Sequence, residues 1–594
     1  MTKFLLYALL VLLAVSLPFE IIHPILLLPW FAFTNLELLA LASIVVWLVD
    51  RFMSLPRGAQ SAMKSGTQKP QIFADFFIRC YPPNPMNPRS IFKSAPPLLW
   101  LPVLFLALTL LSAALAPAHR LDALKFATRV ATGLTVFWML VDSVRSRAHL
   151  AALLWALVLG AGFSALVGLG EALAWPPLVS LLPLFKEAPT LVGGTLRVSA
   201  SLQYATIAAI FFEMSVPLAL ALAATARTRL QRGLALAVAL LCTASVVLTL
   251  SRAGMALLAA LLALLLALAW RQPRFRALLP PTMYTLAVLL AVTGALAWRT
   301  ENFRTRLVTE NDLGWYGAAY SVPASLRLRA GEAITLTVSV QNTGTAQWHT
   351  SGANPFALAY YWLLDDGQVA EKGHVEVALP QPVAPRAGVD VAVTLRPALP
   401  PGDYQLVWGM LQHNILWFRH RNVPEAHTYV HLEEGAGSVA LLPESGATLP
   451  GGAMLTQPPT VGRLDLWRAA LRIWAERPLL GVGPDNFRHL YGRYLNLSAW
   501  DDRLHANNLY LELLTGWGVA GTLAFASLLW VIARRWLRLW RAATGAAAIW
   551  SLALGSSFLI FFLHGFLDYF LEFVPLYLLF WMVTGLIVAL SSEF

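Results

Sequence analysis

The sequence predicts an α-helical polytopic membrane protein with about twelve transmembrane helices and one large polar loop. Of the 594 residues, 58% are hydrophobic and only 13% are charged, and the mean hydropathy is +0.62. Soluble globular domains are about 45–50% apolar and about 25% charged. Apolar segments of roughly 20 residues, the length that crosses a bilayer, recur along the chain. A long polar region, 299–505, interrupts them late in the sequence.

The apolar segments predict transmembrane helices 1–9 within residues 1–298 and helices 10–12 within residues 509–594. The expected spans are 4–28, 30–50, 98–116, 126–143, 150–173, 203–224, 234–250, 254–270, 278–298, 509–532, 545–565 and 572–590. The N-terminal apolar run lacks a small-residue cleavage site, so we expect a retained first helix rather than a signal peptide.

The distribution of arginines predicts the orientation of the chain in the membrane. Basic residues are concentrated in the loop 51–95 and after the fourth, sixth, eighth and tenth spans. Because cytoplasmic loops carry an excess of Lys and Arg, these loops should be cytoplasmic and the large polar loop extracytoplasmic. The net charge of +11 then reports topology. No soluble basic face is evident, which argues against nucleic-acid binding. The cysteines, Cys80 and Cys242, are far apart, so neither a disulfide nor a cysteine metal site is expected.

The large polar loop divides into four parts: a connector at 299–317, a β-sandwich at 318–432, a linker at 433–462 and a helical loop at 463–508. Apolar and polar residues alternate over 334–340 and again over 389–395, as they do in half-buried strands. The stretches NTGTAQW (342–348) and PPGDYQLVWGM (400–410) resemble Ig-like modules of bacterial surface proteins. A spacer role and a carbohydrate- or partner-binding role both remain open for this insert.

Polar residues near the outer ends of several spans are the candidates for chemistry. They are Arg197, Gln203, Tyr204, Glu213, Arg252, His564 and Asp568, and the topology places nearly all of them at the level of the helical loop, which itself contains Arg463 and Arg468. A guanidinium binds phosphate oxygens bidentately and stays charged, so this set suits a phosphate-bearing lipid. Simpler interpretations are a pairing of Arg252 with Glu213, a helix-end pair of His564 with Asp568, and solvated arginines on the loop helix.

Five stretches, in this order and with this topology, resemble the superfamily of O-antigen ligases and O-antigen polymerases. They are GTLRVSASLQYATIAAIFFEMSVPLALAL (194–222), LTLSRAGMALL (248–258), RAALRIWAERPLLGVGPDNFRHLY (468–491), HANNLYLELLTGWGVAG (505–521) and HGFLDYF (564–570). The resemblance implies an integral-membrane glycosyltransferase of the bacterial inner membrane, with a glycan donor linked to undecaprenyl pyrophosphate. It also implies transfer on the outer face without a nucleotide sugar, cofactor or metal. Exterior arginines would bind the pyrophosphate, and a histidine at the start of the span after the loop would assist.

The chain departs from the family pattern at this histidine. Counting back from Gly518-Val519-Ala520-Gly521 places Asn507 at the histidine position and Asn508 at the following asparagine position. The nearest histidine is His505, two residues earlier. Asparagine can donate and accept hydrogen bonds but cannot act as a general base. His505, Glu512 and the acids Asp501 and Asp502 are therefore the candidate bases, and a structural role for His505 at the helix entry stays open.

These observations predict a transferase that moves a glycan from a polyprenyl-pyrophosphate donor to an acceptor hydroxyl on a glycan or lipid. The expected catalytic residues are His505, Asn507 and Asn508, and the expected pyrophosphate-binding residues are Arg197, Arg252, Arg463 and Arg468. The supporting residues are Gln203, Tyr204, Glu213, His564 and Asp568. The alternatives are a polymerase of the same superfamily, a transporter or flippase of lipid-linked sugars, and a non-catalytic scaffold.

Overall fold

The computed structural model describes residues 2–28, 32–54, 97–193, 195–308, 314–351, 354–364, 367–370, 373–413, 415–434, 461–497 and 500–591. The chain divides into a helical unit, made of 1–190, 196–296 and 462–594, and a β-rich unit, made of 191–195 and 297–461. Most of the predicted basic loop 51–95, including Cys80, and most of the predicted linker 433–462 lie outside the described residues.

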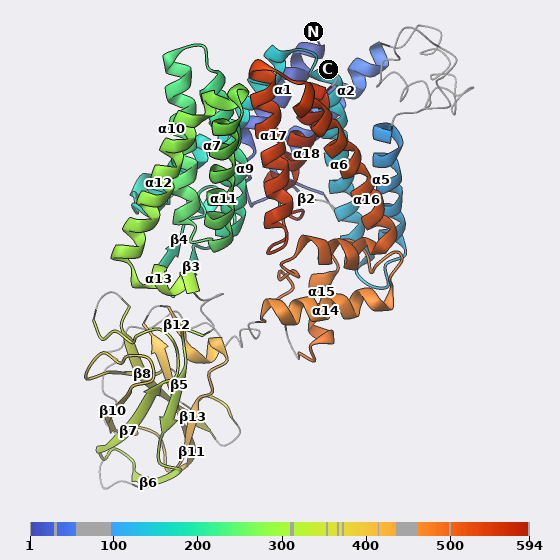
Figure 1. Ribbon diagram of the computed structural model, residues 1–594. Helices are drawn as coiled ribbons and strands as arrows, with labels where there is room; N and C mark the ends of the chain where they lie inside the picture. Colours follow the sequence, from blue (N-terminus) through green and yellow to red (C-terminus); the bar gives the residue numbers. More distant parts are fainter. Residues whose placement is uncertain are drawn as a thin grey trace. The chain divides into compact units, whose positions relative to one another are not determined.

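The helical unit is a bundle of long apolar helices (Figure 1). Its helices are α1 (Thr2–Ser16), α2 (Asn35–Met53), α5 (Pro97–Ala114), α6 (Arg120–Ser143), α7 (Arg147–Ala172), α8 (Pro176–Val179), α9 (Ala205–Thr225), α10 (Arg229–Leu248), α11 (Arg252–Arg271), α12 (Leu279–Arg299), α14 (Arg463–Glu476), α15 (Phe487–Tyr494), α16 (Leu509–Ala542), α17 (Gly545–His564) and α18 (Val574–Ser591). The 3-10 helices η2 (Leu182–Leu184) and η3 (Pro273–Leu278) and the strand pairs β1 (Leu26–Leu27) with β2 (Ala32–Phe33) and β3 (Thr190–Val192) with β4 (Thr195–Arg197) complete the connections.

Nine helices within the described residues are long and apolar enough to cross a membrane, so the chain is a multi-pass membrane protein. Each of the twelve predicted positions contains a helix. However, α1 and the apolar part of α5 are shorter than a full span, and α2 carries Glu37, Asp50 and Arg51. Of the twelve predicted spans, nine therefore coincide with described helices that are long and apolar enough to cross a membrane.

The first predicted span, 4–28, is the largest error in helix length. Helix α1 ends at Ser16, and the chain then turns. Pro18 has no backbone N–H and cannot continue the helical ladder. The segment after it is held instead by Asn35, whose Oδ1 accepts a hydrogen bond from the Ile21 N–H at 2.9 Å and whose Nδ2 donates to the Phe19 carbonyl at 2.7 Å.

The centre of the bundle is formed by α9 and α18. In each of them, 94% of the span is buried inside the protein, whereas for the span that contains α12 the share is 22%. Helix α9 packs against α10 and α17, and α18 packs against α6. A helix that is apolar on all sides suits either a bundle centre or contact with lipid, and the burial assigns α9 and α18 to the centre.

Helices α14 and α15 lie at one end of the bundle, opposite the end that contains the start of α1 and the end of α18 (Figure 1). They are joined to α16 through a break in that helix at Gly518, where φ is 59° and ψ is −168°. The break frees backbone groups that bond to the segment between α14 and α15. Val519 N–H donates to the Pro478 carbonyl at 2.8 Å, and Val482 N–H donates to the Thr515 carbonyl at 2.8 Å.

The β-rich unit contains two sheets. One has the order β10-β7-β5, formed by β5 (Ala318–Ser321), β7 (Ile334–Asn342) and β10 (Gly388–Leu395). The other has the order β6-β13-β11-β8-β9, with β12 (Leu416–Trp417) paired to β11, and is formed by β6 (Ser325–Arg329), β8 (Phe356–Leu364), β9 (Val375–Ala378), β11 (Gly402–Gln412) and β13 (Ala426–Glu433). The helix α13 (Glu301–Val308) and the 3-10 helix η4 (Phe418–Arg421) belong to the same unit.

The predicted strand alternation is confirmed. In β7, Val338 and Val340 are buried while Thr337 and Ser339 are exposed, and β10 alternates in the same way. The two strands pair antiparallel, with Val391 opposite Val338. The second sheet includes a parallel pair, β13 with β6, among antiparallel ones. These sheets establish a β-rich unit, and its Ig-like character stays a prediction.

Replacing Gly518 by alanine should destabilise the helical unit. A Cβ at this position would lie 2.4 Å from the Leu479 backbone, and this region of φ and ψ is nearly confined to glycine, at a strain of about 1–3 kcal/mol. We therefore expect Gly518→Ala to lower the thermal unfolding temperature in detergent. Gly294→Ala, in α12 with no atom within 4 Å of the added Cβ, is the matched control and should leave it unchanged or raise it slightly, because alanine favours a helix interior over glycine. Equal unfolding temperatures for the two variants would contradict this account of the break.

Candidate functional site

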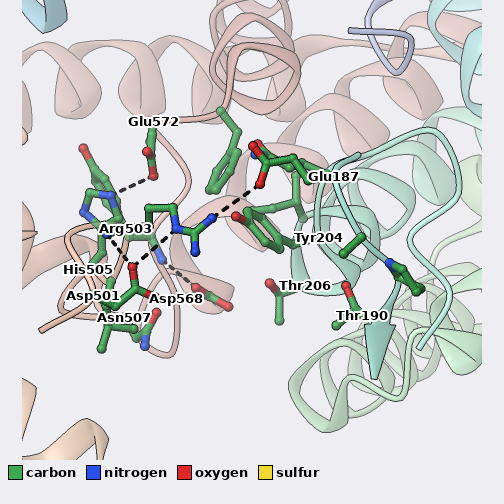
Figure 2. A pocket seen from close by; sticks show the side chains of 17 residues that line it. Glu187, Thr190, Tyr204, Thr206, Asp501, Arg503, His505, Asn507, Asp568 and Glu572 are labelled. Carbon is green, nitrogen blue, oxygen red and sulfur yellow. Dashed lines mark hydrogen bonds and ion pairs between the residues drawn. The ribbon is translucent and has the colours of Figure 1, made fainter. Parts of the chain in front are cut away.

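A cavity of about 420 Å³ lies in the helical unit (Figure 2). Three segments line it: the loop before β3, the start of α9, and the loops on either side of the α16–α17 pair. The lining residues are Glu187, Ala188, Pro189, Thr190, Gln203, Tyr204, Thr206, Ile207, Asp501, Arg503, Leu504, His505, Asn507, Asp568, Tyr569, Glu572 and Phe573. Charged and hydrogen-bonding side chains stand among apolar ones in this lining, which is typical of a binding or catalytic site.

His505 is the centre of the charged groups in this cavity. Its Nδ1 lies 3.1 Å from Glu512 Oε1, and its Nε2 lies 2.7 Å from Glu572 Oε2 and 3.8 Å from Asp485 Oδ1. Glu512 also accepts the Ala506 N–H at 2.8 Å, which fixes the loop just before α16. The imidazole is buried, and the ring of Tyr569 lies against it at 4.8 Å between centroids. His505 is therefore held by a carboxylate on each nitrogen.

The carboxylates set the protonation of this cluster. Burial lowers the pKa of the His505 imidazole, but the charges of Glu572 and Glu512 outweigh it and raise that pKa well above its usual range. For Glu572, burial raises the pKa, yet the neighbouring His505 more than offsets it and leaves the pKa low. Burial raises the pKa of Asp485 to about 6 despite His505. At neutral pH the cluster therefore holds an imidazolium paired with carboxylates.

Arg503 is an exposed residue of the cavity lining that pairs with two carboxylates. Its Nη1 lies 3.4 Å from Glu187 Oε2 and its Nε lies 3.4 Å from Asp501 Oδ1 (Figure 2). With Asp568 and Glu572, the lining contains four carboxylates against the two cations Arg503 and His505. An acidic cavity disfavours an anionic group and favours a neutral or cationic one.

An aromatic pair lines another part of the cavity. The rings of Tyr204 and Phe573 meet edge to face at 5.8 Å. They come from the residue before α9 and from the residue before α18. Aromatic rings beside hydrogen-bonding groups are typical of a ligand-binding surface.

Of the predicted catalytic residues, His505 and Asn507 line the cavity, and Asn508 does not. Asn508 is the N-cap of α16, because its Oδ1 accepts the N–H groups of Tyr510 and Leu511 at 3.0 and 3.1 Å. Its Nδ2 donates to the Phe566 carbonyl at 3.0 Å, which ties α16 to the turn after α17. The geometry thus gives Asn508 a structural function. Among the predicted supporting residues, Gln203, Tyr204 and Asp568 line the cavity.

The other predicted residues form a second group outside the cavity lining. Arg197 Nε donates to the Thr249 carbonyl at 2.9 Å, which joins β4 to the turn that precedes Arg252 and α11. Two residues after Arg252, Gly254 packs against the carboxylate of Glu213. Glu213 Oε2 lies 3.1 Å from His564 Nδ1.

Arg463 and Arg468 differ in their positions on α14. Arg463 lies close enough to His564 for an electrostatic interaction, so it is near the second group. Arg468 is exposed and pairs with Asp465 at 3.0 Å. His564 pairs with Glu213 rather than making the predicted helix-face pair with Asp568, because α17 ends at His564 and Asp568 lies in the turn beyond it. Among the described residues, the contact found for Arg468 is with Asp465, which belongs to neither group.

Sequence reasoning did not identify Glu572, Arg503 or Asp485 as site residues. Glu572 lies in the short turn between α17 and α18, where an acid among apolar residues (FLEFVP) is a signal for a function. Asp485 has φ 68° and pairs through Oδ2 with Arg488 at 3.0 Å. Its place beside His505 depends on the folding of the α14–α15 segment against α16, which local sequence does not reveal.

Asp485, His505 and Glu572 also present ligand atoms of the types that bind metals, all within 4.8 Å of one another. The direct pair between His505 and Glu572 at 2.7 Å would have to open to admit an ion. The expectation of a metal-independent site stays a prediction.

Comparison with known proteins supports part of the resemblance. Residues 426–526 match the protein family described as O-antigen ligase. This range contains His505, Asn507, Glu512 and the break at Gly518. No curated protein matches the chain. A similar solved structure is Pseudomonas fluorescens alkylpurine DNA glycosylase AlkC bound to DNA containing an abasic site analog, at 15% identity and a TM-score of 0.13, covering 56% of this chain and 96% of that one. So low a TM-score carries no argument.

The ion pairs of His505 should make stability depend on pH. A histidine whose folded-state pKa is raised contributes stability that is fully present below its unfolded pKa of about 6.5 and is lost as pH rises through the folded pKa. The unfolding-temperature advantage of the wild type over His505→Gln should therefore shrink between pH 7 and pH 9.5. His427→Gln, an exposed position on β13, is the control and should show no such trend. An advantage that is constant or grows with pH would contradict the assignment.

Proposed function

We propose that this protein is a membrane glycosyltransferase that moves a glycan from a polyprenyl-pyrophosphate donor to an acceptor hydroxyl, on the extracytoplasmic face of a bacterial inner membrane. The observation that carries the proposal is His505, held between Glu512 and Glu572 on a polar cavity at the end of the helices. His505 lies within the range that matches the O-antigen ligase family. That match supports ligase- or polymerase-like transfer of lipid-linked glycans.

The two groups of charged residues would bind different substrates. The cavity is rich in carboxylates and includes an aromatic pair, so it suits the hydroxyl-rich acceptor. The second group brings together Arg197, the turn before Arg252, and Arg463 near His564. These guanidinium groups suit the pyrophosphate, which is anionic and prefers bidentate donors. Asp568, in the cavity lining, also acts on His564 and so connects the two groups.

The transfer step then assigns a function to Glu572. The acceptor oxygen attacks the anomeric carbon, the bond from that carbon to the pyrophosphate oxygen breaks, and the electron pair leaves with the pyrophosphate. The hydroxyl proton moves to a carboxylate, as in inverting glycoside hydrolysis, where a carboxylate activates the attacking water. Glu572 lines the cavity and is ionised, whereas His505 with its raised pKa is already protonated. We therefore propose that Glu572 is the general base. His505 would orient both Glu572 and the acceptor.

Electrostatic stabilisation and proximity would supply the rest of the rate. Arginines in a site with little water stabilise the negative charge that grows on the leaving pyrophosphate. Binding the lipid-linked donor at the second group and the acceptor in the cavity would convert a bimolecular reaction into an effectively intramolecular step. A polymerase of the same superfamily would use the same chemistry with a lipid-linked glycan as the acceptor.

Substituting Glu572 by glutamine should abolish most transfer. We expect kcat to fall by roughly 10²-fold or more, because general-base assistance contributes about 10²–10⁴-fold. The assay uses purified protein in nanodiscs with undecaprenyl-pyrophosphate oligosaccharide and measures the release of undecaprenyl pyrophosphate. Glu332→Gln, an exposed glutamate in the β-rich unit, is the matched control. Full activity of Glu572→Gln would remove the base assignment, and donor movement across vesicle membranes without transfer would favour a transporter.

Arg252 should contribute to binding of the glycan donor. Arg252→Ala should reduce kcat/KM for the donor by roughly 10²-fold, the typical effect of removing one electrostatic donor at a developing charge. Arg252→Lys should recover only part of it, because lysine lacks the bidentate fork. The measurement is the dependence of rate on donor concentration, with Arg145→Lys, an exposed arginine paired with Asp142, as the control. An unchanged donor dependence in both Arg252 variants would place the pyrophosphate elsewhere.

A further inference from the structure

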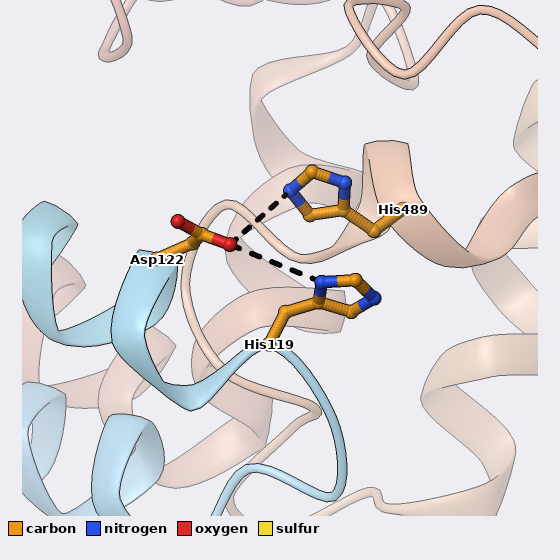
Figure 3. Close-up of side chains that lie close together, drawn as sticks. All are labelled: His119, Asp122 and His489. Atoms are coloured by element: carbon orange, nitrogen blue, oxygen red, sulfur yellow. Dashed lines mark ion pairs between the residues drawn. The ribbon is translucent and has the colours of Figure 1, made fainter.

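A second cluster of histidines and a carboxylate lies outside the proposed active site (Figure 3). It consists of His119 and Asp122, at the start of α6, and His489, on α15. Their ligand atoms lie within 4.8 Å of one another. None of the three lines the cavity described above. All three belong to the helical unit.

The geometry turns one nitrogen of each histidine toward the same oxygen. His119 Nδ1 lies 3.8 Å from Asp122 Oδ2, and His489 Nε2 lies 3.9 Å from it. These distances are too long for hydrogen bonds, which require about 2.7–3.2 Å. They are slightly wider than the separation of about 3.3 Å between ligand atoms of a tetrahedral Zn²⁺ bound at about 2.0–2.1 Å. All three atoms lie within 4.8 Å of one another, so small movements of the side chains would bring them to the separations found around a bound ion.

His489 supplies a second observation that points to a ligand. Its Nε2 is buried and has no hydrogen-bond partner among the described residues. A buried polar atom without a partner is costly, and a bound ion is one of its ordinary explanations. Within the described part of the chain, Lys125 pairs with the other oxygen of Asp122, Oδ1, at 3.4 Å, whereas Oδ2 faces the two histidines.

We propose that His119, Asp122 and His489 bind a divalent transition-metal ion of the Zn²⁺ class. A site of two imidazoles and one carboxylate favours Zn²⁺ over Mg²⁺. A water molecule would occupy the fourth coordination position. The imidazole rings now lie nearly parallel, at 4.3 Å between centroids and 15° between planes. Binding requires each ring to tilt toward the common ion, and the partial exposure of His119 and Asp122 leaves room for it.

The ion would fasten α15 to the start of α6. The neighbour of His489 on α15 is Arg488, which pairs with Asp485 beside His505. A metal at this position would therefore stabilise the segment that brings Asp485 to the proposed active site. Three protein ligands and a water also occur in catalytic zinc sites, but none of these residues lines the cavity, so we assign the ion a structural function that does not depend on the transfer reaction.

Isothermal titration calorimetry on the full-length, chelator-treated protein in detergent tests the site. We expect one Zn²⁺ per chain and no response to Mg²⁺, with at least about tenfold weaker Zn²⁺ binding in His119→Asn and in His489→Asn. His374→Asn is the matched control, since His374 also contacts a carboxylate, Glu376, at 3.1 Å but in the β-rich unit. It should bind like the wild type.

Two outcomes overturn the proposal. One is the absence of Zn²⁺ binding by the wild type, and the other is wild-type binding by His119→Asn and His489→Asn, which would mean adventitious binding elsewhere. If either histidine variant fails to fold, Asp122→Asn and the visible spectrum of bound Co²⁺ replace it. A wild-type Co²⁺ spectrum with nitrogen ligands that is lost in Asp122→Asn supports the site, and an unchanged spectrum refutes it.

Discussion

The break in α16 at Gly518 is the constraint on which the arrangement of the site depends. At the break, the carbonyls of Thr515 and Gly516 accept the N–H groups of Val482 and Gly483 at 2.8 and 3.1 Å. The hydroxyl of Ser112, on α5, lies 2.7 Å from the Leu480 carbonyl and 2.8 Å from the Gly516 carbonyl, and it can donate its one proton to either of them. Backbone groups within an apolar bundle must find partners, and here two non-helical segments satisfy each other. Asp485 follows immediately, so its approach to His505 is a consequence of this pairing.

The charges near the cavity are tolerable because each has a partner. A single buried carboxylate is costly, whereas His505 with Glu572 and Asp485 with Arg488 are paired at 2.7 and 3.0 Å. A similar pair, Lys186 with Glu171, is buried behind the loop that carries Glu187, and Glu171 also accepts the Ser199 and Ala200 N–H groups at 3.1 and 2.8 Å. Removing one member of such a pair leaves a buried charge, which makes these residues informative to mutate.

The positions of the helices could be predicted from the sequence better than their lengths or the site. Apolar runs of the right length marked all twelve helix positions. The predicted length of α1 was wrong because the prediction followed the apolar run and ignored Pro18, although the helix ends at Ser16. For the site, His505 and Asn507 were found through a motif in one continuous stretch. Glu572 and Asp485 reach His505 from 67 residues after and 20 residues before it through tertiary packing, which no local pattern encodes. The N-cap function of Asn508 was not predicted, although an asparagine before an apolar helix is an ordinary N-cap signal, and a catalytic function for Asn508 stays a prediction.

The contacts on the two sides of the cavity differ in strength, and this difference decides which side of the cavity opens more easily. On one side, the start of α16 and the turn after α17 are joined by backbone bonds, including Leu509 N–H to the Gly565 carbonyl at 2.7 Å. On the other side, Arg503 and Glu187 form an ion pair whose side chains are 64% and 70% exposed. Exposed pairs of this kind contribute about 0–1 kcal/mol and weaken with salt. One side of the cavity is therefore held by backbone hydrogen bonds and the other by an exposed ion pair of low energy, so separating Arg503 from Glu187 would leave the backbone contacts of α16 and α17 intact.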